Sequence, residues 1–157
     1  MNKKIYVHYG NDRFNPKHGM SMATPYKPSG FWASPVDSSW GWKDWLLSED
    51  YHTETLETSF EFCLKEGTRI LQVRKPEDII PYLKKGENYE IYRRRQRYYA
   101  PMAGMELDHE KLVQEFDAME LFLSEGYSLF RNNFIFSIWD VDSIVIWRPE
   151  CVVPVES

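Results

Sequence analysis

Three polar side chains stand in apolar stretches of the sequence, and each of them could take part in chemistry. His8 lies in the run 5–9, Ser34 closes the run 30–34, and Glu120 lies in the run 116–123. A carboxylate among apolar residues is costly to bury unless a partner or a reaction needs it. A half-buried histidine can bond a ligand hydroxyl through a ring nitrogen. Glu120 is therefore the candidate catalytic carboxylate, and His8 is a candidate ligand-binding residue.

A second candidate site lies in the segment 27–45, which holds four of the six tryptophans of the chain. If residues 30–34 form a strand, Trp32 and Ser34 share one face of it, because side chains alternate along a strand. An aromatic ring beside a hydroxyl suits a planar heterocycle that carries a sugar. Packing in a core is the alternative for this pair, and for Trp42 and Trp45 we expect the core.

Structural roles are also open for His8 and Glu120. His8 fits a structural histidine at the end of a strand. Glu120 is the only charge between two apolar faces if its segment is a strand. The same segment fits a helix with an apolar stripe of Leu112, Phe116, Met119 and Leu123, which would place Glu120 at the edge of a solvated face.

The run 93–97 holds four arginines beside tyrosines, and it fits a solvated surface or a phosphate-binding loop.

The elements that must position these residues follow from apolar periodicity and from glycine and proline. We expect strands at 5–9, 30–34, 68–73, 118–123, 134–138, 142–147 and 151–155. We expect helices at about 41–51, from Thr53 to Gly67, from Pro76 through 79–83, and from a cap at Asp108 to about Glu115. Residues 11–29 form a long loop, and residues 86–106 are the least regular part. This mixture favours one α+β domain over residues 1–157, with mostly antiparallel strand pairing.

Composition narrows the class of protein. The 157 residues are 16% aromatic and carry a net charge of -5, which argues against a general nucleic-acid binder. Two cysteines are too few for a disulfide framework, and no metal-ligand spacing is present. Neither a membrane-spanning run nor a signal peptide is evident. We therefore expect a cytoplasmic protein without a membrane partner or a metal.

Taken together, three blocks resemble the small bacterial and phage-encoded proteins of the ADP-ribosyltransferase-like superfamily. The blocks are residues 6–10 (YVHYG), 30–35 (GFWASP) with 41–45 (GWKDW), and 116–120 (FDAME) with 139–143 (WDVDS). Many such enzymes carry a histidine or arginine on a first strand, a tyrosine or serine on a second, and a glutamate on a late strand. His8, Ser34 and Glu120 occupy these places in order. The sequence departs from the family at Trp32, where tyrosine is usual, and at Ala118, where glycine is frequent.

The resemblance implies split antiparallel sheets with flanking helices, and NAD+ in the cleft between them. It implies that Glu120 stabilises the oxocarbenium charge as nicotinamide leaves the ribose. It also implies that His8 is catalytic together with Glu120, because His8 bonds a ribose hydroxyl and fixes the orientation of the cofactor. His8, Tyr9, Trp32 and Ser34 are the implied cofactor-binding residues, so that His8, Glu120, Trp32 and Ser34 should line one cleft.

Two functions from different classes follow from this resemblance. The first is an enzyme that transfers ADP-ribose from NAD+ to a protein or nucleic acid, or hydrolyses NAD+. The second is an inactive relative that binds a nucleotide or a partner through the same cleft, such as a phage-encoded inhibitor of a host system. An RNA-contacting module that uses residues 93–97 is a third, weaker option.

Overall fold

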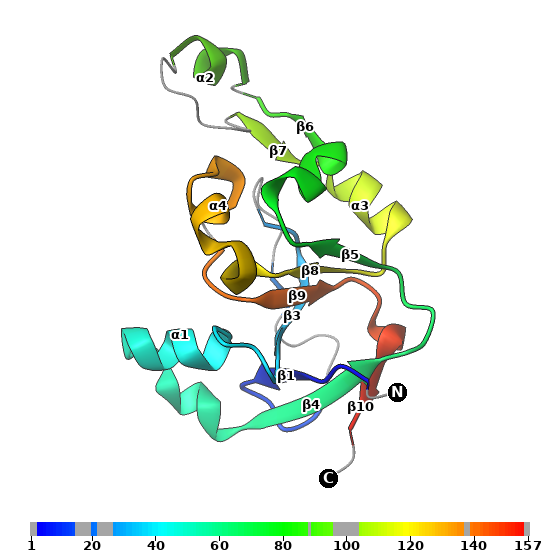
Figure 1. The fold of residues 1–157 in the computed structure, drawn as a ribbon. Helices are drawn as coiled ribbons and strands as arrows, with labels where there is room; N and C mark the ends of the chain where they lie inside the picture. The colour runs from blue at the N-terminus through cyan, green and yellow to red at the C-terminus, as the bar shows by residue number, and fades with distance from the viewer. Residues whose placement is uncertain are drawn as a thin grey trace.

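The computed structural model describes residues 3–14, 20–21, 27–87, 89–95, 104–136 and 139–155, and it combines a large sheet with a few helices (Figure 1). The strands are β1 (Tyr6–Tyr9), β2 (Met20–Ser21), β3 (Gly30–Pro35), β4 (Ser59–Leu64), β5 (Ile70–Val73), β6 (Leu83–Lys85), β7 (Met105–Leu107), β8 (Ala118–Leu121), β9 (Ser143–Ile146) and β10 (Val152–Pro154). The α-helices are α1 (Trp42–Glu49), α2 (Tyr89–Arg95), α3 (His109–Glu115) and α4 (Tyr127–Arg131). Short 3-10 helices span Thr53–Glu57, Pro76–Tyr82, Leu123–Gly126, Phe134–Phe136 and Pro149–Cys151.

The main sheet has the strand order β10-β4-β1-β3-β9-β8-β5, with β2 paired to β3, while β6 and β7 pair separately. Among the described strands every pairing is antiparallel except that of β5 with β8. The predicted α+β class with mostly antiparallel pairing is therefore confirmed. Figure 1 shows β6, β7 and α2 projecting from one end of the molecule, away from β1 and β4.

The main sheet is strongly bent, and its two faces carry separate cores. The Tyr6 hydroxyl on β1 donates a hydrogen bond of 2.7 Å to Glu120 on β8, although β3 and β9 lie between these strands. On a flat sheet three strand spacings would separate the two backbones by about 14 Å, too far for these side chains to meet. The face that holds this contact is called the inner face, and its core includes Phe31, Phe62 and Ile144.

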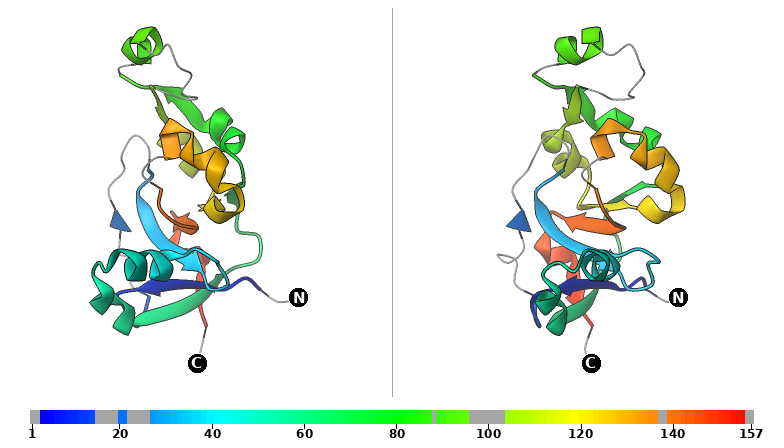
Figure 2. Two further views of the ribbon diagram at one scale, coloured as in Figure 1. Left: turned by 60° about the vertical axis from the view of Figure 1, so that its left-hand side comes forward. Right: turned by 90° about the vertical axis from the view of Figure 1, so that its left-hand side faces the viewer.

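The other face of the sheet is called the outer face, and helices cover much of it. Met119, Leu121 and Val145 from β8 and β9 pack there against Leu112 of α3 and Phe130 of α4. The two views in Figure 2 show α4 and the 3-10 helix before it lying against this part of the sheet. Glycine is needed where β3 begins, because Gly30 has φ of +150° and a Cβ there would lie 2.4 Å from Val145.

Several predicted elements agree with the structure. The helix expected at 41–51 is α1, the strand expected at 118–123 contains β8, and the helix capped by Asp108 is α3. The Asp108 carboxylate accepts a hydrogen bond of 3.2 Å from the backbone N–H of Lys111, as an N-cap residue does. Because residues 118–121 are a strand, the helical alternative for Glu120 is wrong.

The helix predicted from Thr53 to Gly67 is wrong. A 3-10 turn at Thr53–Glu57 leads instead into strand β4. Phe60 and Phe62 are buried while Ser59 and Glu61 are exposed, so the segment alternates with the period of a strand. The apolar residues at 56, 60 and 64 also match a helix, and the pairing of β4 with both β1 and β10 decided between the two patterns.

The strand predicted at 134–138 is also wrong for its described part. Residues Phe134–Phe136 form a 3-10 turn, and residues 137–138 lie outside the described residues. The Asn133 side chain accepts from the backbone N–H of Ile135 at 3.4 Å, which favours a turn, and Ile135 itself is fully buried. Of the arginine run, residues 93–95 belong to α2, where Arg94 is exposed, and residues 96–97 lie outside the described residues.

Asp117 is an ion-pair centre at the start of β8. Its carboxylate binds the guanidinium of Arg69 at 3.0 Å and that of Arg148 at 2.8 Å, and it accepts from the backbone N–H of Arg69. The side-chain hydrogen bonds from Arg69 are the largest cause that lowers the pKa of Asp117 to about 2. These contacts join the segments before β5 and after β9 to the strand that carries Glu120.

Candidate ligand-binding site

A pocket opens where β1 and β3 separate. These strands pair at Tyr6–Pro35 and Val7–Ser34, after which β1 continues along β4 and β3 continues along β9. Beyond the last pair, the Nδ1 atom of His8 lies 2.7 Å from the carbonyl oxygen of Trp32. The pocket has a volume of about 410 Å³, within the range of small-molecule sites. Its lining residues are Val7, His8, Tyr9, Lys27, Trp32, Ala33, Ser34, Trp42, Trp139, Asp140, Val141 and Ser143. We call it the first pocket.

Indole rings form much of the wall of the first pocket. Trp32 and Trp139 meet edge to face, with ring centres 5.2 Å apart. The ammonium of Lys27 lies 4.8 Å from the ring centre of Trp32, within cation–π distance. Burial lowers the pKa of Lys27, and the charge of Asp140 opposes that shift. The pocket therefore combines flat apolar surface with the ammonium of Lys27 and the carboxylate of Asp140, and the rings and the ammonium suit a ligand that carries a planar ring and an anionic group.

His8 lies at the junction of the two strands. Because a carbonyl oxygen only accepts hydrogen bonds, Nδ1 of His8 carries the proton and donates to Trp32. The imidazole stacks on Phe31 at 4.4 Å between ring centres, on the inner side of the sheet. His8 thus replaces a backbone hydrogen bond at the point where β1 leaves β3, and it shapes the mouth of the first pocket.

Ser34 lines the first pocket and also holds helix α1. Its hydroxyl donates to the backbone carbonyl of Asp142 at 2.9 Å and accepts from the backbone N–H of Trp42 at 3.0 Å. The hydroxyl hydrogen is therefore used within the protein, and only a lone pair of Ser34 can serve a ligand. The second contact fixes the first turn of α1 and so places Trp42 beside the pocket.

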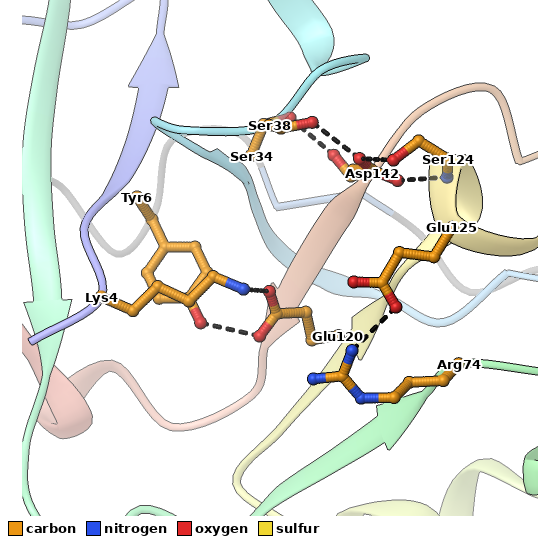
Figure 3. Close-up of polar contacts among 9 residues, drawn as sticks. All are labelled: Lys4, Tyr6, Ser34, Ser38, Arg74, Glu120, Ser124, Glu125 and Asp142. Atoms are coloured by element: carbon orange, nitrogen blue, oxygen red, sulfur yellow. Dashed lines mark hydrogen bonds and ion pairs between the residues drawn. The ribbon is translucent and has the colours of Figure 1, made fainter.

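The backbone of Asp142 is held in turn by its own carboxylate. Figure 3 shows this group receiving the hydroxyls of Ser38 and Ser124, at 2.7 Å and 2.5 Å. The backbone N–H of Ser124 also donates to it, at 2.6 Å. Asp142 is buried, so these hydrogen bonds replace the water that the charge would otherwise require. They join the turn after β3, the 3-10 helix after β8 and the start of β9 into one frame behind the first pocket.

Glu120 lies on the other side of the sheet from Trp32 and Ser34. The strand register aligns Glu120 with Ile144 and Ile144 with Ala33, so the carboxylate points to the inner face. Its oxygens bind the ammonium of Lys4 at 2.6 Å and the hydroxyl of Tyr6 at 2.7 Å (Figure 3). Burial and the adjacent charge of Glu120 raise the pKa of Tyr6, which keeps its hydroxyl a donor. Glu120 is only 1% exposed and is not among the residues that line the first pocket.

The structure therefore brings together four of the five predicted site residues. His8, Tyr9, Trp32 and Ser34 all line the first pocket. The ring of His8 stacks on Phe31 on the inner side of the sheet, and Glu120 lies on that inner face outside the pocket. The lining residues that were not predicted as site residues include Lys27, Trp139 and Asp140. Trp139 and Asp140 belong to the block 139–143, which is part of the resemblance to the family, so the sequence did indicate this segment. Lys27 lies at the end of the long loop 11–29. The nearby Pro28 and Gly30 indicate a loop and a strand start, and they do not indicate a binding residue.

Comparison with known proteins gives no relative from which a role could be transferred. A scan against protein-family models and searches of curated proteins and of solved structures returned no significant match.

Within the described part of the chain, no group of three or more His, Cys, Asp or Glu side chains is arranged to hold a metal ion. The described helices are all too short or too polar to cross a bilayer.

Proposed function

We propose that this protein binds a nucleotide of the NAD+ class in the first pocket. The observation that carries the proposal is the indole pair of Trp32 and Trp139 with Lys27 beside it, at the point where two parts of the sheet separate. A base or nicotinamide ring gains stacking energy from such walls, and the ammonium suits a phosphate. The same separation of β1 from β3 supports an ADP-ribosyltransferase-like arrangement, in which β10-β4-β1 is one half and β3-β9-β8-β5 the other.

Substitution of Trp32 by leucine tests this proposal. We expect Trp32→Leu to weaken NAD+ binding by about 5- to 150-fold, because loss of a stacking partner costs about 1–3 kcal/mol per base. Isothermal titration calorimetry with NAD+ and with nicotinamide mononucleotide measures the effect. Tyr89→Leu is the control, since Tyr89 is an aromatic residue on α2 that does not line the first pocket. Absence of NAD+ binding to the wild-type protein at millimolar concentration would refute the proposal.

ADP-ribose transfer to a macromolecule is a second proposal, and Glu120 is the observation that favours it. A carboxylate is held in the middle of a strand and shares the inner face with the His8 ring. Such a carboxylate can stabilise the charge that develops on ribose as nicotinamide leaves. In this structure Lys4 and Tyr6 occupy its oxygens, and Glu120 lies on the opposite face of the sheet from Trp32. The reaction therefore requires these hydrogen bonds to open and the ribose to reach the inner face.

Nicotinamide release separates the two proposals. If the protein is a transferase or an NAD+ hydrolase, the wild type releases nicotinamide from NAD+, and Glu120→Gln slows the reaction by about 100-fold or more. Labelled NAD+ incubated with a cell lysate reports transfer to an acceptor. If NAD+ binds and remains intact, the protein is a binding protein and the first proposal stands alone.

A further inference from the structure

A second pocket lies beside the first and shares Trp139 and Asp140 with it. Its volume is about 460 Å³, and it lies between α1, the 3-10 helix Leu123–Gly126 and α4. Its lining residues are Trp40, Trp45, Glu49, Ser124, Tyr127, Arg131, Trp139 and Asp140. Half of these residues are aromatic, and three are charged. In the first pocket, the described lining residues include one lysine and one carboxylate.

Two aromatic rings of the second pocket, those of Trp40 and Trp45, are held in place by contacts within the protein. Trp45 stacks on Trp42 with ring centres 5.1 Å apart, and Tyr51 meets its edge at 5.9 Å. The indole N–H of Trp40 donates to the backbone carbonyl of Asp140 at 2.9 Å. Rings that are fixed before binding lose little conformational entropy when a ligand packs on them.

The charges of the second pocket favour a cation. Among the described lining residues, two carboxylates, on Glu49 and Asp140, oppose one guanidinium, that of Arg131. That guanidinium lies 5.3 Å from the ring centre of Tyr127, within the distance of a cation–π contact. An aromatic surface attracts a cation through the negative faces of its rings, and the carboxylates add Coulombic attraction. A phosphate placed here would face two like charges.

We propose that the second pocket binds a guanidinium group. A guanidinium is planar, stacks on indole and phenol rings, and presents a fork of N–H donors to a carboxylate. A quaternary ammonium would use the rings but could not donate to Glu49 or Asp140, so the carboxylates favour a cation that donates hydrogen bonds. The group can belong to a free guanidino compound or to an arginine side chain of another molecule.

Calorimetry with the full chain tests the chemistry of this pocket. Ethylguanidine is compared with ethylurea, which is neutral and has nearly the same shape. We expect ethylguanidine to bind more tightly, and we expect Glu49→Gln and Trp45→Leu each to weaken it about three-fold, as partly exposed cation–π and charge contacts do. Glu66→Gln makes the same charge change on an exposed residue outside the pocket and should leave binding unchanged. Equal binding of ethylguanidine and ethylurea would overturn the proposal.

Arg131→Met is expected to change ethylguanidine binding in the opposite direction from Glu49→Gln and Trp45→Leu. Removing this guanidinium removes a like charge and vacates the ring of Tyr127, so we expect ethylguanidine to bind about three-fold more tightly. Inorganic phosphate is the opposing probe. If phosphate binds the wild type and Arg131→Met abolishes that binding, the pocket is an anion site and the proposal fails. An acetylated and amidated Gly-Arg-Gly peptide that binds more tightly than ethylguanidine would identify a protein arginine as the source, and equal or weaker binding would identify a free guanidino compound.

Discussion

Replacing Asp142 by alanine is expected to lower the free energy of unfolding by about 3–4 kcal/mol, near the upper end of single substitutions. The buried carboxylate accepts hydrogen bonds from Ser38, from the Ser124 hydroxyl and from the Ser124 backbone N–H. Each hydrogen bond to a charged group contributes about 1.5–3 kcal/mol, and the three share one acceptor, so their sum overestimates the loss. Alanine would also leave the Ser124 N–H without this acceptor inside the protein.

Denaturant unfolding followed by tryptophan fluorescence measures this change. Asp12→Ala is the matched control, because Asp12 is an exposed aspartate whose loss should change stability by no more than about 0.5 kcal/mol. The Asp142 variant should also bind ligands of the first pocket less well, since the frame behind Ser34 and α1 is loosened. A loss of stability below about 1 kcal/mol would show that solvent or neighbouring groups replace the three hydrogen bonds.

Sequence periodicity predicts an element without ambiguity only where a single pattern fits. Residues 41–51 carry tryptophans at helical spacing, and α1 forms there. The segment of β4 was mistaken for a helix because its apolar residues fit both periods. What decides between them is the presence of β1 on one side and β10 on the other. Such long-range pairing is a property of the whole sheet, so the residues of β4 alone do not decide between the two periods.

The sequence predicted which side chains of the candidate site share a face of one strand, but not how the strands that carry them are ordered and aligned. Alternation correctly predicted that Trp32 and Ser34 share a face, and both line the first pocket. Whether Glu120 joins them depends on strand order and register. A shift of one residue between β3, β9 and β8 would turn Glu120 from the inner face to the outer face. The bend that lets Tyr6 reach Glu120 depends on the same long-range arrangement, so the sequence could not indicate this partner.

Substitution of Lys4 by methionine is expected to lower the free energy of unfolding by about 2 kcal/mol. Breaking a fully buried ion pair from one side costs about 3–5 kcal/mol, because the remaining charge loses its counter-ion. The side chain of Lys4 is 39% exposed, whereas that of Glu120 is 2% exposed. Because solvent already screens part of this pair, the expected loss of about 2 kcal/mol lies below the range for a fully buried pair. Methionine keeps an unbranched apolar chain near Phe122, whose ring centre lies 4.6 Å from the Lys4 ammonium.

A double-mutant cycle with Glu120→Gln shows whether the lost stability comes from the stranded carboxylate. A neutral glutamine needs no ammonium beside it and can still accept from Tyr6, so Lys4→Met should cost at least about 1 kcal/mol less in the Glu120→Gln background. Equilibrium unfolding of the wild type, both single variants and the double variant measures this coupling. Additivity within about 0.5 kcal/mol would mean that Lys4 does not hold Glu120 in solution. Tyr6 alone would then hold the Glu120 carboxylate. Only that hydrogen bond, and not the ion pair with Lys4 as well, would have to open before Glu120 could act on a ribose.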